Sequence, residues 1–408
     1  MARNVLQLID SFQQGGTERQ AVQLTRLLAE SGRYRVHVAC LSGEGPLRSE
    51  VERLNLGDIP SFPLTSFYDR NAARQLRRLA RYLREREIEL VHAHDFYCNI
   101  FGTAAAALAR TPARIASRRE TEGIRSRLQR TIERQAFARA HAVVANAEAI
   151  RRQLISEGLP PAKVRTIHNG MDTARVRPRA DLTREEALSS AGLPAGGARR
   201  FVTVVANMRH AEKDQATFLR AARRVKDEVP DAAFVLAGEG AQLEPLRALA
   251  AELGLGGDAV FTGRCARVAE LLAASEVCVL SSRGVEGFSN SILEYMAAAR
   301  PVVATDVGGA REQIAEGETG YVVPAGDDAL MAARIASLLN DPERARAMGE
   351  RGLQRVKELF SCEAQLRRTE ELYEELFERA ADGSAAAGRT RRGEAEASAA
   401  GGAGRATR

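Results

Sequence analysis

The stretch SRGVEGFSNSILEYMAAARPVVATDVGGARE, residues 282–312, changes its pattern three times. It opens as a polar, glycine-containing loop and continues as a short helix pattern with Ile292, Leu293 and Met296 on one face. It then becomes an apolar strand, which a second glycine-rich turn follows. A loop, a helix and a buried strand in this order are typical of a βαβ unit, whose two strands run parallel. The stretch therefore predicts a parallel sheet covered by helices.

The same alternation of short apolar runs and helix patterns continues along nearly the whole chain of 408 residues. We therefore predict an α/β fold of two doubly wound, Rossmann-like domains that face each other across a cleft. The predicted strands are residues 4–10, 34–41, 89–95, 113–119, 140–147, 164–170, 201–208, 232–240, 259–263, 276–282, 300–306 and 319–324.

The amino-acid composition of two segments indicates where the domains begin and end. A polar segment rich in Gly, Pro and Arg, without a strand pattern, separates the two sets of strands, and the last residues are too poor in apolar side chains to bury a core. The predicted segments are a first domain at 1–175, a linker at 176–200, a second domain at 201–360, a C-terminal helix at 361–380 that packs back on the first domain, and a disordered tail at 381–408.

Neither a membrane-spanning run nor a signal peptide is expected from the sequence, and the five cysteines show no CxxC spacing. These features predict a cytoplasmic protein without a structural zinc site. The net charge of +6 is unevenly distributed, since residues 1–178 carry +11 and the remainder −5. A basic half is typical of proteins that meet phosphates, nucleic acid or anionic lipid, or else of Arg-rich solvated helices. The absence of Trp and the scarcity of aromatic residues argue against nucleic acid.

Two glycine-containing loops follow predicted strands. Gly15 and Gly16 stand between the first strand and the first helix, where backbone N–H groups and a helix N-terminus favour an anion. In the second loop, the N–H groups of Phe288, Ser289 and Asn290 open the next helix and are expected to bind an anion in the same way. The first of these loops alone is also compatible with an ordinary turn.

Charged residues accompany these loops. Glu286 is expected in the cleft, and Glu294, about one turn into the following helix, can accept two vicinal hydroxyls of a ribose; a surface helix position is the alternative. Arg209 and Lys213 follow the first strand of the second domain and can stabilise a diphosphate, unless they are exposed charges at a helix start. No D-x-D metal anchor is present.

Two histidines, His92 and His94, alternate at the end of a strand and therefore point to the same side. A metal site needs a third ligand, which the sequence does not supply nearby, and a buried histidine is the commoner role. His94, at the carboxyl end of the strand, is the better placed of the two for the cleft.

Together these pieces resemble a known family. The motifs GGTERQ, ELVHAHD, IHNGMD, NMRHAEKDQATFLRAA, FVLAGEG and EGFSNSILEYMAAARPVVATDVGG occur in the order typical of family 4 glycosyltransferases, also called glycosyl transferases group 1. The resemblance covers roughly residues 1–375 and includes the E-x7-E motif as Glu286 and Glu294. It implies a GT-B fold, with an N-terminal acceptor domain and a C-terminal nucleotide-sugar domain.

The resemblance also implies roles for single residues. The catalytic set is Glu286, His94, Arg209 and Lys213, and the donor-binding set is Gly15, Gly16, Gly238, Glu239, Arg264, Phe288, Ser289, Asn290 and Glu294. The segment NMRHAEKD departs from the family pattern, because Asn207 and Asp214 stand where the family has glycines, and this makes the local loop geometry an open point.

By resemblance, the activity is metal-independent transfer of a hexose from a UDP- or GDP-sugar to a sugar or lipid-linked acceptor, with retained anomeric configuration and no cofactor. Acceptor pockets of the family lie in loops that correspond to residues 42–70 and 117–127. The expected context is synthesis of cell-surface polysaccharide, lipopolysaccharide or glycolipid, by a cytoplasmic enzyme in reversible contact with an anionic membrane. A nucleotide-sugar epimerase and a non-enzymatic nucleotide-sugar binder are the alternatives.

Overall fold

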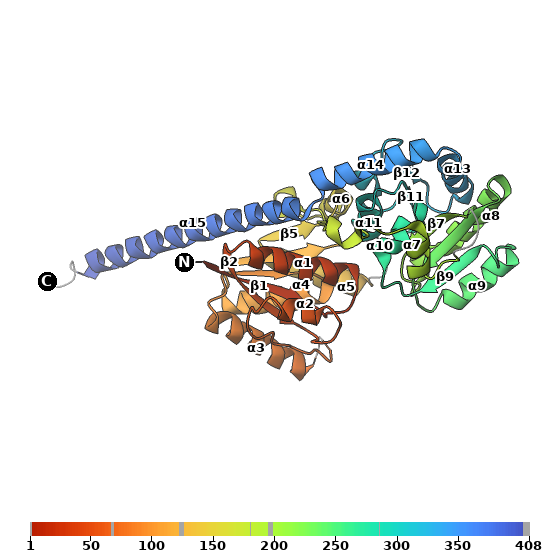
Figure 1. The fold of residues 1–408 in the computed structure, drawn as a ribbon. Coiled ribbons are helices and arrows are strands. Elements are labelled where there is room, and N and C mark those ends of the chain that lie inside the picture. Colours follow the sequence, from red (N-terminus) through yellow and green to blue (C-terminus); the bar gives the residue numbers. More distant parts are fainter. Residues whose placement is uncertain are drawn as a thin grey trace, which may run out of the picture. The chain divides into compact units, whose positions relative to one another are not determined.

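The computed structural model describes residues 2–66, 69–121, 126–179, 181–194, 199–284 and 286–402. The chain forms two compact units (Figure 1). The first comprises Met1–Ser117, Thr131–Val143 and Leu366–Arg408, and the second comprises Arg118–Arg130 and Val144–Gln365. The predicted domains at 1–175 and 201–360 divide the chain differently, because residues 144–175 group with the second unit.

The first half of the chain builds a six-stranded sheet in the order β2-β1-β3-β4-β5-β6, in which β1 runs parallel to β2 and β3, and β3 parallel to β4. Its elements are β1 (Arg3–Ile9), α1 (Gly16–Glu30), β2 (Tyr34–Cys40), α2 (Arg48–Glu52), α3 (Arg70–Glu85), β3 (Leu90–Ala93), α4 (Phe96–Ala109), β4 (Ala113–Arg118), α5 (Arg127–Arg139), β5 (Ala142–Ala145), α6 (Glu148–Ser156), η1 (Pro161–Lys163) and β6 (Val164–Thr166).

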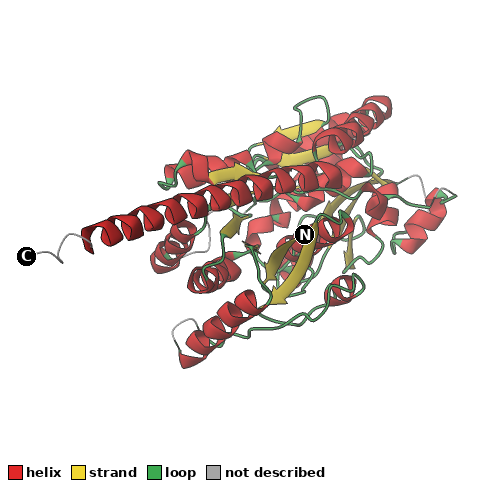
Figure 2. Cartoon of the chain, turned by 90° about the vertical axis from the view of Figure 1, so that its left-hand side faces the viewer, coloured by secondary structure: helices red, strands yellow, loops and turns green. Residues whose placement is uncertain are grey.

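Side chains of β1 alternate between two cores. Leu6 and Leu8 pack with residues of α3 and α4, whereas Ile9 packs with residues of α1 and α2. A strand that is buried on both faces reads as a continuous apolar run, which is why the sequence VLQLI forms a central strand. Figure 2 shows strands enclosed between helices in this way.

The second half builds another six-stranded parallel sheet, in the order β12-β11-β10-β7-β8-β9. Its elements are η2 (Thr173–Val176), α7 (Arg184–Ser190), β7 (Arg200–Val205), η3 (Ala211–Lys213), α8 (Gln215–Glu228), β8 (Ala232–Ala237), α9 (Leu243–Glu252), β9 (Ala259–Gly263), α10 (Val268–Ala273), β10 (Ser275–Leu280), α11 (Asn290–Ala297), β11 (Val302–Thr305), α12 (Ala310–Gln313), β12 (Gly320–Val323), α13 (Asp328–Leu339) and α14 (Pro342–Leu359).

Each of the twelve predicted strands overlaps one strand of these two sheets, so the predicted α/β class is confirmed. In the second sheet, Val202 and Val204 of β7 pack with α8 and α13, while Phe201 packs with α7 and α10 on the other face. Both sheets are therefore covered by helices on both faces, as doubly wound folds require.

Each sheet has one point where the direction of winding reverses. In the first sheet β2 and β3 lie on opposite sides of β1, so the switch point is between β1 and β3. In the second sheet β8 and β10 flank β7, so the switch point is between β7 and β10. Ligands of open α/β sheets bind beyond the carboxyl ends of the strands at such points, because the following loops diverge there.

The predicted linker at 176–200 contains the helix α7, which the sequence analysis did not expect. Ala187 and Leu188 of this helix are buried against Phe201 and Leu271, so the segment belongs to the packed second unit. A capping box between Thr183 and Glu186 starts the helix. The sequence analysis missed this helix because its apolar face is short and most of its residues are polar. Residues 180 and 195–198 of the predicted linker lie outside the described part of the chain.

The C-terminal helix α15 runs from Cys362 to Gly402 and is drawn without a break in Figures 1 and 2. This corrects the predicted disorder of residues 381–402, while residues 403–408 lie outside the described part. Helix hydrogen bonds are local, and the Ala, Glu and Arg of this segment are good helix formers, so the lack of core-forming residues did not prevent a helix. In the first unit, Leu372, Leu376 and Phe377 of α15 are buried.

No helix among the described residues is both long enough and apolar enough to span a membrane.

Candidate active site

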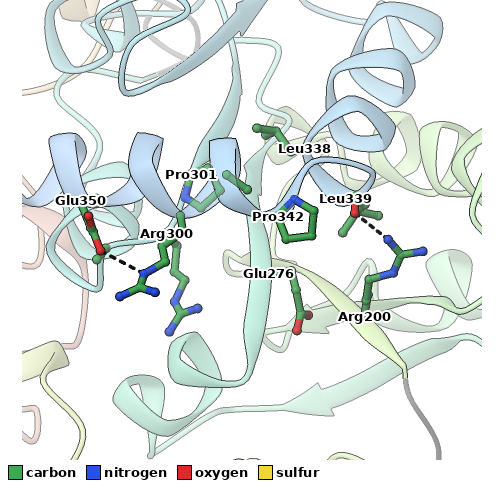
Figure 3. A pocket seen from close by; sticks show the side chains of 11 residues that line it. Arg200, Glu276, Arg300, Pro301, Leu338, Leu339, Pro342 and Glu350 are labelled. Carbon is green, nitrogen blue, oxygen red and sulfur yellow. Dashed lines mark hydrogen bonds and ion pairs between the residues drawn. The ribbon is translucent and has the colours of Figure 1, made fainter.

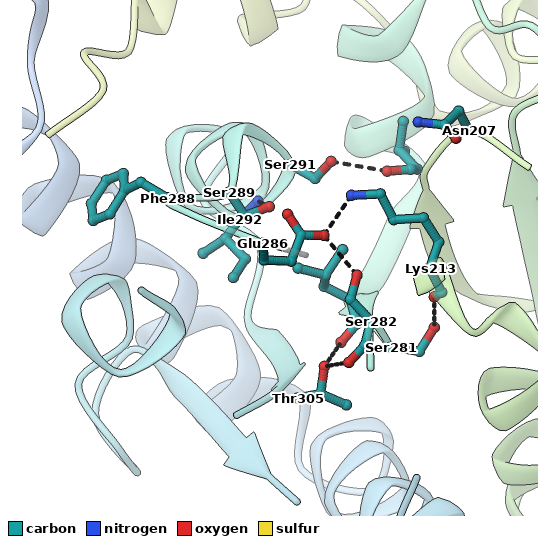
Figure 4. Close-up of polar contacts among 12 residues, drawn as sticks. Asn207, Lys213, Ser281, Ser282, Glu286, Phe288, Ser289, Ser291, Ile292 and Thr305 are labelled. Atoms are coloured by element: carbon teal, nitrogen blue, oxygen red, sulfur yellow. Dashed lines mark hydrogen bonds and ion pairs between the residues drawn. The ribbon is translucent and has the colours of Figure 1, made fainter. Parts of the chain in front are cut away.

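Glu286 and Lys213 meet in an ion pair at the switch point of the second unit. Glu286 follows β10 and Lys213 ends η3 after β7, and Lys213 Nζ lies 2.5 Å from Glu286 Oε1. The hydroxyl of Ser282 donates a second hydrogen bond to the same oxygen at 2.7 Å (Figure 4). The structure thus brings together two residues that the sequence predicted as catalytic.

The two carboxylate oxygens of Glu286 have different surroundings. The residue is buried, with 7% of its surface exposed, and both contacts use Oε1. Among the described residues, no side chain or backbone group donates a hydrogen bond to Oε2. A buried carboxylate is costly unless it is paired, so the contacts from Lys213 and Ser282 stabilise Glu286 through one oxygen and leave the other available to a ligand.

The ends of neighbouring strands fix this pair in place. The hydroxyl of Ser281 donates to the carbonyl oxygen of Lys213 at 3.0 Å, and the hydroxyl of Thr305 at the end of β11 donates to the carbonyl of Ser282 at 2.6 Å. Three adjacent strands therefore contribute to the position of one carboxylate, which makes the geometry rigid.

The loop after Glu286 is held by residues far away in the sequence but in the same unit. A Cβ atom on Gly287 would lie 2.0 Å from the carbonyl oxygen of Arg119, so only glycine fits. Asn169 donates from its amide to the carbonyl of Phe288 at 2.9 Å and to Oδ1 of Asn290 at 3.0 Å. The side chain of Arg119 donates in turn to Asn169 Oδ1 at 2.9 Å.

One expectation for this loop is corrected. The N–H group of Ser289 donates to the side chain of Gln313 at 3.1 Å, and the Gln313 amide returns a hydrogen bond to the Ser289 carbonyl at 2.7 Å. This N–H is therefore not open to an anion. Ser289 serves instead as the N-cap of α11, with its hydroxyl facing the N–H of Ile292. Sequence reasoning did not find Gln313, which lies 24 residues further on, because the contact depends on the tertiary fold.

The remaining predicted residues of the second unit lie at the carboxyl ends of its strands. Arg209 follows β7 and is exposed, Gly238 and Glu239 follow β8, and Arg264 follows β9. Gly238 has φ +155, and a Cβ there would meet the carbonyl of Ala206 at 2.0 Å, so this turn requires glycine. Glu294 lies in α11 and is half-buried.

Gly15, Gly16 and His94 lie in the first unit, at the switch point between β1 and β3. Gly15 is the N-cap of α1 and supplies no side-chain cap to that helix. His94 follows β3 and is fully buried, and its Nε2 lies 2.8 Å from Gln7 Oε1. The roles given to these three residues remain predictions.

Sequence reasoning missed two carboxylates at this same point. Asp10 directly follows β1, and Asp95 follows His94 and caps α4 by accepting from the N–H of Cys98 at 2.9 Å. Burial, and then the nearby charge of Asp10, raise the pKa of Asp95 to about 7. Burial also raises the pKa of Asp10. Each aspartate comes directly after an apolar strand run, which is the signal that could have identified them.

A cavity of about 320 Å³ opens at the amino ends of strands in the second sheet, opposite the carboxyl ends that the Glu286–Lys213 pair follows. Arg200 at the start of β7, Glu276 at the start of β10, and Arg300 and Pro301 before β11 line it (Figure 3). Arg200 pairs with Asp231 and donates to the carbonyl of Leu339. Because this cavity lies at the amino ends of the strands, it is separate from the Glu286–Lys213 pair.

Among the described residues, no group of three or more His, Cys, Asp or Glu side chains is arranged to hold a metal ion.

Comparisons with known proteins agree with this geometry. The model of the family "Glycosyl transferases group 1" matches residues 189–355, and that of "Glycosyltransferase Family 4" matches residues 14–175. The GDP-mannose-dependent alpha-(1-6)-phosphatidylinositol monomannoside mannosyltransferase of Mycolicibacterium smegmatis is 31% identical over 314 residues, which are 70% of this chain and 81% of that protein. The chain belongs to the group 1, family 4 glycosyltransferases. EpsD of Bacillus subtilis is 34% identical over 194 residues, or 47% of this chain, and this match spans only 50% of EpsD.

Solved structures share the fold of this glycosyltransferase family member. The crystal structure of Anabaena HepE in complex with UDP matches with a TM-score of 0.80 at 19% identity, covering 91% of this chain and 100% of that one. At this identity the likeness shows the fold alone, and it confirms the predicted GT-B fold.

The structure also shows how this glycosyltransferase tolerates its departures from the family pattern. Asp214, which replaces a glycine, has φ +43 and ψ +46, the left-handed conformation that Asp adopts more readily than most residues. Its carboxylate caps α8 through the N–H of Thr217 and pairs with Arg283 Nε at 2.5 Å. Asn207 is not among the described residues with positive φ, so glycine is not required there.

We predict that Asp214→Ala lowers the free energy of unfolding by about 2–3 kcal/mol. A lost N-cap costs about 1 kcal/mol, and a left-handed alanine costs about 1–2 kcal/mol more. Asp214→Asn keeps both the conformation and the cap and serves as the matched control, which should lose much less. Urea unfolding followed by circular dichroism measures both variants, and equal midpoints for the two would contradict this account of the loop.

Proposed function

We propose that this chain is a retaining, metal-independent glycosyltransferase that moves a sugar from a UDP- or GDP-sugar to a hydroxyl of a sugar or lipid-linked acceptor. The observation that carries the proposal is the Lys213–Glu286 pair at the switch point of the second sheet. In this pair, Lys213 supplies a cation for the leaving diphosphate, and Glu286 supplies a carboxylate with one oxygen available to a sugar hydroxyl.

The names of related proteins support this class of donor and acceptor. One M. smegmatis relative is named as a GDP-mannose-dependent enzyme acting on a phosphatidylinositol mannoside. LpsB of Rhizobium meliloti, 32% identical over 218 residues, is named as a lipopolysaccharide core mannosyltransferase. HepE was crystallised with UDP and with UDP-glucose. We therefore extend synthesis of cell-surface glycans or glycolipids to this chain as part of the proposal.

The ion pair makes the proposed chemistry electrostatically consistent. An ammonium group has three protons, so Lys213 can keep its contact with Glu286 and still donate to a phosphate oxygen. Its charge offsets the repulsion between the Glu286 carboxylate and an anionic diphosphate. Arg209, exposed on the same loop, adds a second cation, so that fixed side chains stabilise the charge that develops as the bond breaks.

In the proposed step, the acceptor oxygen bonds to the anomeric carbon on the face from which the diphosphate leaves. The bond from that carbon to the phosphate oxygen breaks, and the acceptor proton passes to a phosphate oxygen of the leaving group. Glu286 positions sugar hydroxyls near the anomeric carbon and does not form a covalent intermediate. Glu294 would bind the ribose, Gly238, Glu239 and Arg264 the nucleotide side, and Gly15, Gly16 and His94 the diphosphate and sugar from the first unit.

We predict that Glu286→Gln lowers kcat on the order of 10²–10³-fold, the effect of removing one preorganised electrostatic group. The variant keeps the shape of the side chain but removes the charge that pairs with Lys213. Release of UDP or GDP in the presence of acceptor measures turnover, after a thermal-shift screen of nucleotide sugars has identified the donor.

Glu318→Gln, an exposed glutamate of the same unit, is the matched control and should turn over normally. Near-normal turnover by Glu286→Gln would overturn the assignment of this residue. Donor incubated without acceptor distinguishes the epimerase alternative, because only an epimerase would change the sugar under those conditions.

We also predict that transfer persists in EDTA, because Arg209 and Lys213 supply the positive charge that a metal supplies in other transferases. Arg209→Ala should weaken both donor binding and turnover, and added Mg²⁺ should not restore them. Loss of wild-type activity in EDTA with recovery on addition of Mg²⁺ or Mn²⁺ would refute the metal-independent mechanism.

A basic face on α3 supports the proposed contact with membranes. Leu79 and Leu83 of this helix are buried, while its arginines are exposed. Among the described residues, no carboxylate forms an ion pair with these arginines, which are Arg70, Arg74, Arg77, Arg78, Arg81 and Arg84. Each contributes about 1 kcal/mol near an anionic surface, so several together suffice for reversible docking of a cytoplasmic enzyme.

We predict salt-sensitive sedimentation of the protein with anionic liposomes and none with neutral ones, because the attraction is electrostatic and is screened by salt. The triple variant Arg74→Gln, Arg77→Gln, Arg81→Gln should lose this binding. The control variant Arg224→Gln, Arg344→Gln, Arg346→Gln changes exposed arginines of the second unit and should keep it. Equal, negligible sedimentation with both liposomes at low salt would exclude membrane docking.

A further inference from the structure

The cavity at the amino ends of the second sheet is lined by both cationic and anionic side chains. Arg200 comes from β7, Glu276 from β10, Arg300 from the segment before β11, and Arg346 and Glu350 from α14 (Figure 3). The way in which these charges pair determines the kind of ligand that the cavity accepts.

Two of the three cations already have a carboxylate partner. Arg200 binds Asp231 through Nε and Nη2, at 2.7 and 2.5 Å. In this bidentate geometry, one edge of a guanidinium group matches the two oxygens of a carboxylate. Arg346 pairs with Glu350 at 3.1 Å, one turn further along α14. Neither cation needs a ligand to balance its charge.

Arg300 is the third cation, and within the described part of the chain no carboxylate forms an ion pair with it. The one hydrogen bond of its side chain runs from Nη1 to the carbonyl oxygen of Ser275, at 2.9 Å. Glu276 favours the charge of Arg300 electrostatically, but both of its oxygens are occupied, by Arg184 and by the N–H of Phe201. Every guanidinium nitrogen donates and none accepts, so only an acceptor can match Arg300.

The guanidinium group of Arg300 is also poorly solvated. Among the described residues its Nε has no acceptor, and neighbouring atoms cover it. Its Nη2 lacks an acceptor as well but is not closed off from solvent, so Nη2 is the nitrogen that a ligand reaches. Burial lowers the pKa of Arg300, although a guanidinium group stays protonated at neutral pH. An anion that supplies the missing acceptor would stabilise this cation.

The remaining wall of the cavity is apolar. It consists of Ala299, Pro301, Leu338, Leu339, Pro342 and Ala345. The volume of about 320 Å³ lies at the lower end of the range for small-molecule sites, and an apolar wall with a few polar groups is typical of such sites. The cavity therefore suits an oxyanion that is attached to a small apolar group.

We propose that this cavity binds a small organic oxyanion, a carboxylate or a phosphate monoester, with its charged oxygens at Arg300 Nη2 and its apolar part against Pro301 and Pro342. A small movement of the Arg300 side chain brings Nε into the same contact, in the geometry by which Arg200 binds Asp231. The proposal does not depend on glycosyl transfer by this chain.

The cavity and the candidate active site lie at opposite ends of the same strands. β7 and β10 begin at the cavity, whereas Lys213 and Glu286 come after their carboxyl ends. An occupant of the cavity therefore leaves the candidate active site free.

Isothermal titration calorimetry with benzoate, phenyl phosphate and inorganic phosphate, at constant ionic strength, tests the proposal. We expect benzoate or phenyl phosphate to bind at one site per chain, and the tighter of the two identifies the preferred charged group. Inorganic phosphate lacks the apolar part and should bind more weakly than phenyl phosphate. Absence of saturable binding by both organic anions would overturn the proposal, and equal affinity for the two phosphates would overturn the role of the apolar wall.

Arg300→Gln removes the unpaired charge and should weaken binding about 10–100-fold, the scale of charge-assisted hydrogen bonds. The matched control is Arg344→Gln, which removes an exposed charge of α14 outside the cavity and should bind as the wild type does. Circular dichroism checks that both variants fold. Wild-type affinity in a folded Arg300→Gln variant would refute the site.

A second pair of variants leaves Arg300 in place. Ala299 lines the cavity and has φ +55, a left-handed conformation that Asp and Asn adopt more readily than alanine does. Ala299→Asp adds a carboxylate to the cavity and should abolish binding, whereas the neutral Ala299→Asn should retain it. Equal affinities of these two variants would contradict an anion site at this position.

A last variant separates the cavity from the candidate active site. Lys213→Gln removes a cation at the other end of the strands and should leave the affinity for benzoate and phenyl phosphate unchanged. Loss of binding in this variant would place the anion at the candidate active site and overturn the assignment to the cavity.

Discussion

The order of the strands in each sheet is the constraint on which the candidate site depends. Because β8 and β10 lie on opposite sides of β7, the loops after β7 and β10 diverge and leave their polar groups without strand partners. Lys213 and Glu286 come from these two loops and form an ion pair with each other. The same topology in the first sheet places Gly15 and His94 at the ends of β1 and β3. A different order of the same strands in the sheets would separate Lys213 from Glu286 and Gly15 from His94.

Much of this fold could be predicted from the sequence, because strands buried on both faces are written as apolar runs. VLQLI and FVLA are examples. Because such runs alternate with helix patterns, they predict parallel sheets, and they also show which charged residues stand in the loops after the strands. The predictions of a linker and of a disordered tail were wrong, because they relied on local composition alone. Leu188 packs α7 against the second sheet although its neighbours are polar, and the Ala-rich end of α15 forms a helix although its sequence is poor in core-forming residues.

The sequence named residues for the candidate site, but it did not indicate how they contact one another. Glu286 and Lys213 are 73 residues apart, and nothing in their local sequence says that they pair. Gln313 and Asn169 are ordinary polar residues in the sequence, yet they determine which backbone groups of the loop at 287–290 remain accessible. Positions such as Asp214 could be recognised as departures from a pattern, whereas the left-handed backbone that makes the aspartate acceptable is visible only in three dimensions.

One further contact of the second unit limits where an anion can bind. The carboxylate of Glu312 in α12 accepts from the N–H groups of Glu148 and Ala149, at 2.7 and 2.8 Å, and so occupies the N-terminus of α6. Desolvation opposes the charge, but hydrogen bonds from His168 and these two N–H groups hold the pKa of Glu312 below its ordinary value.

Glu312 therefore behaves as a tethered ligand. A group attached to the same chain competes at an effective concentration on the order of millimolar or higher, so a free phosphate at lower concentration cannot displace it. The helix terminus that is electrostatically suited to an anion is closed by the protein itself. An anion that binds this unit must therefore use other groups than the N-terminus of α6.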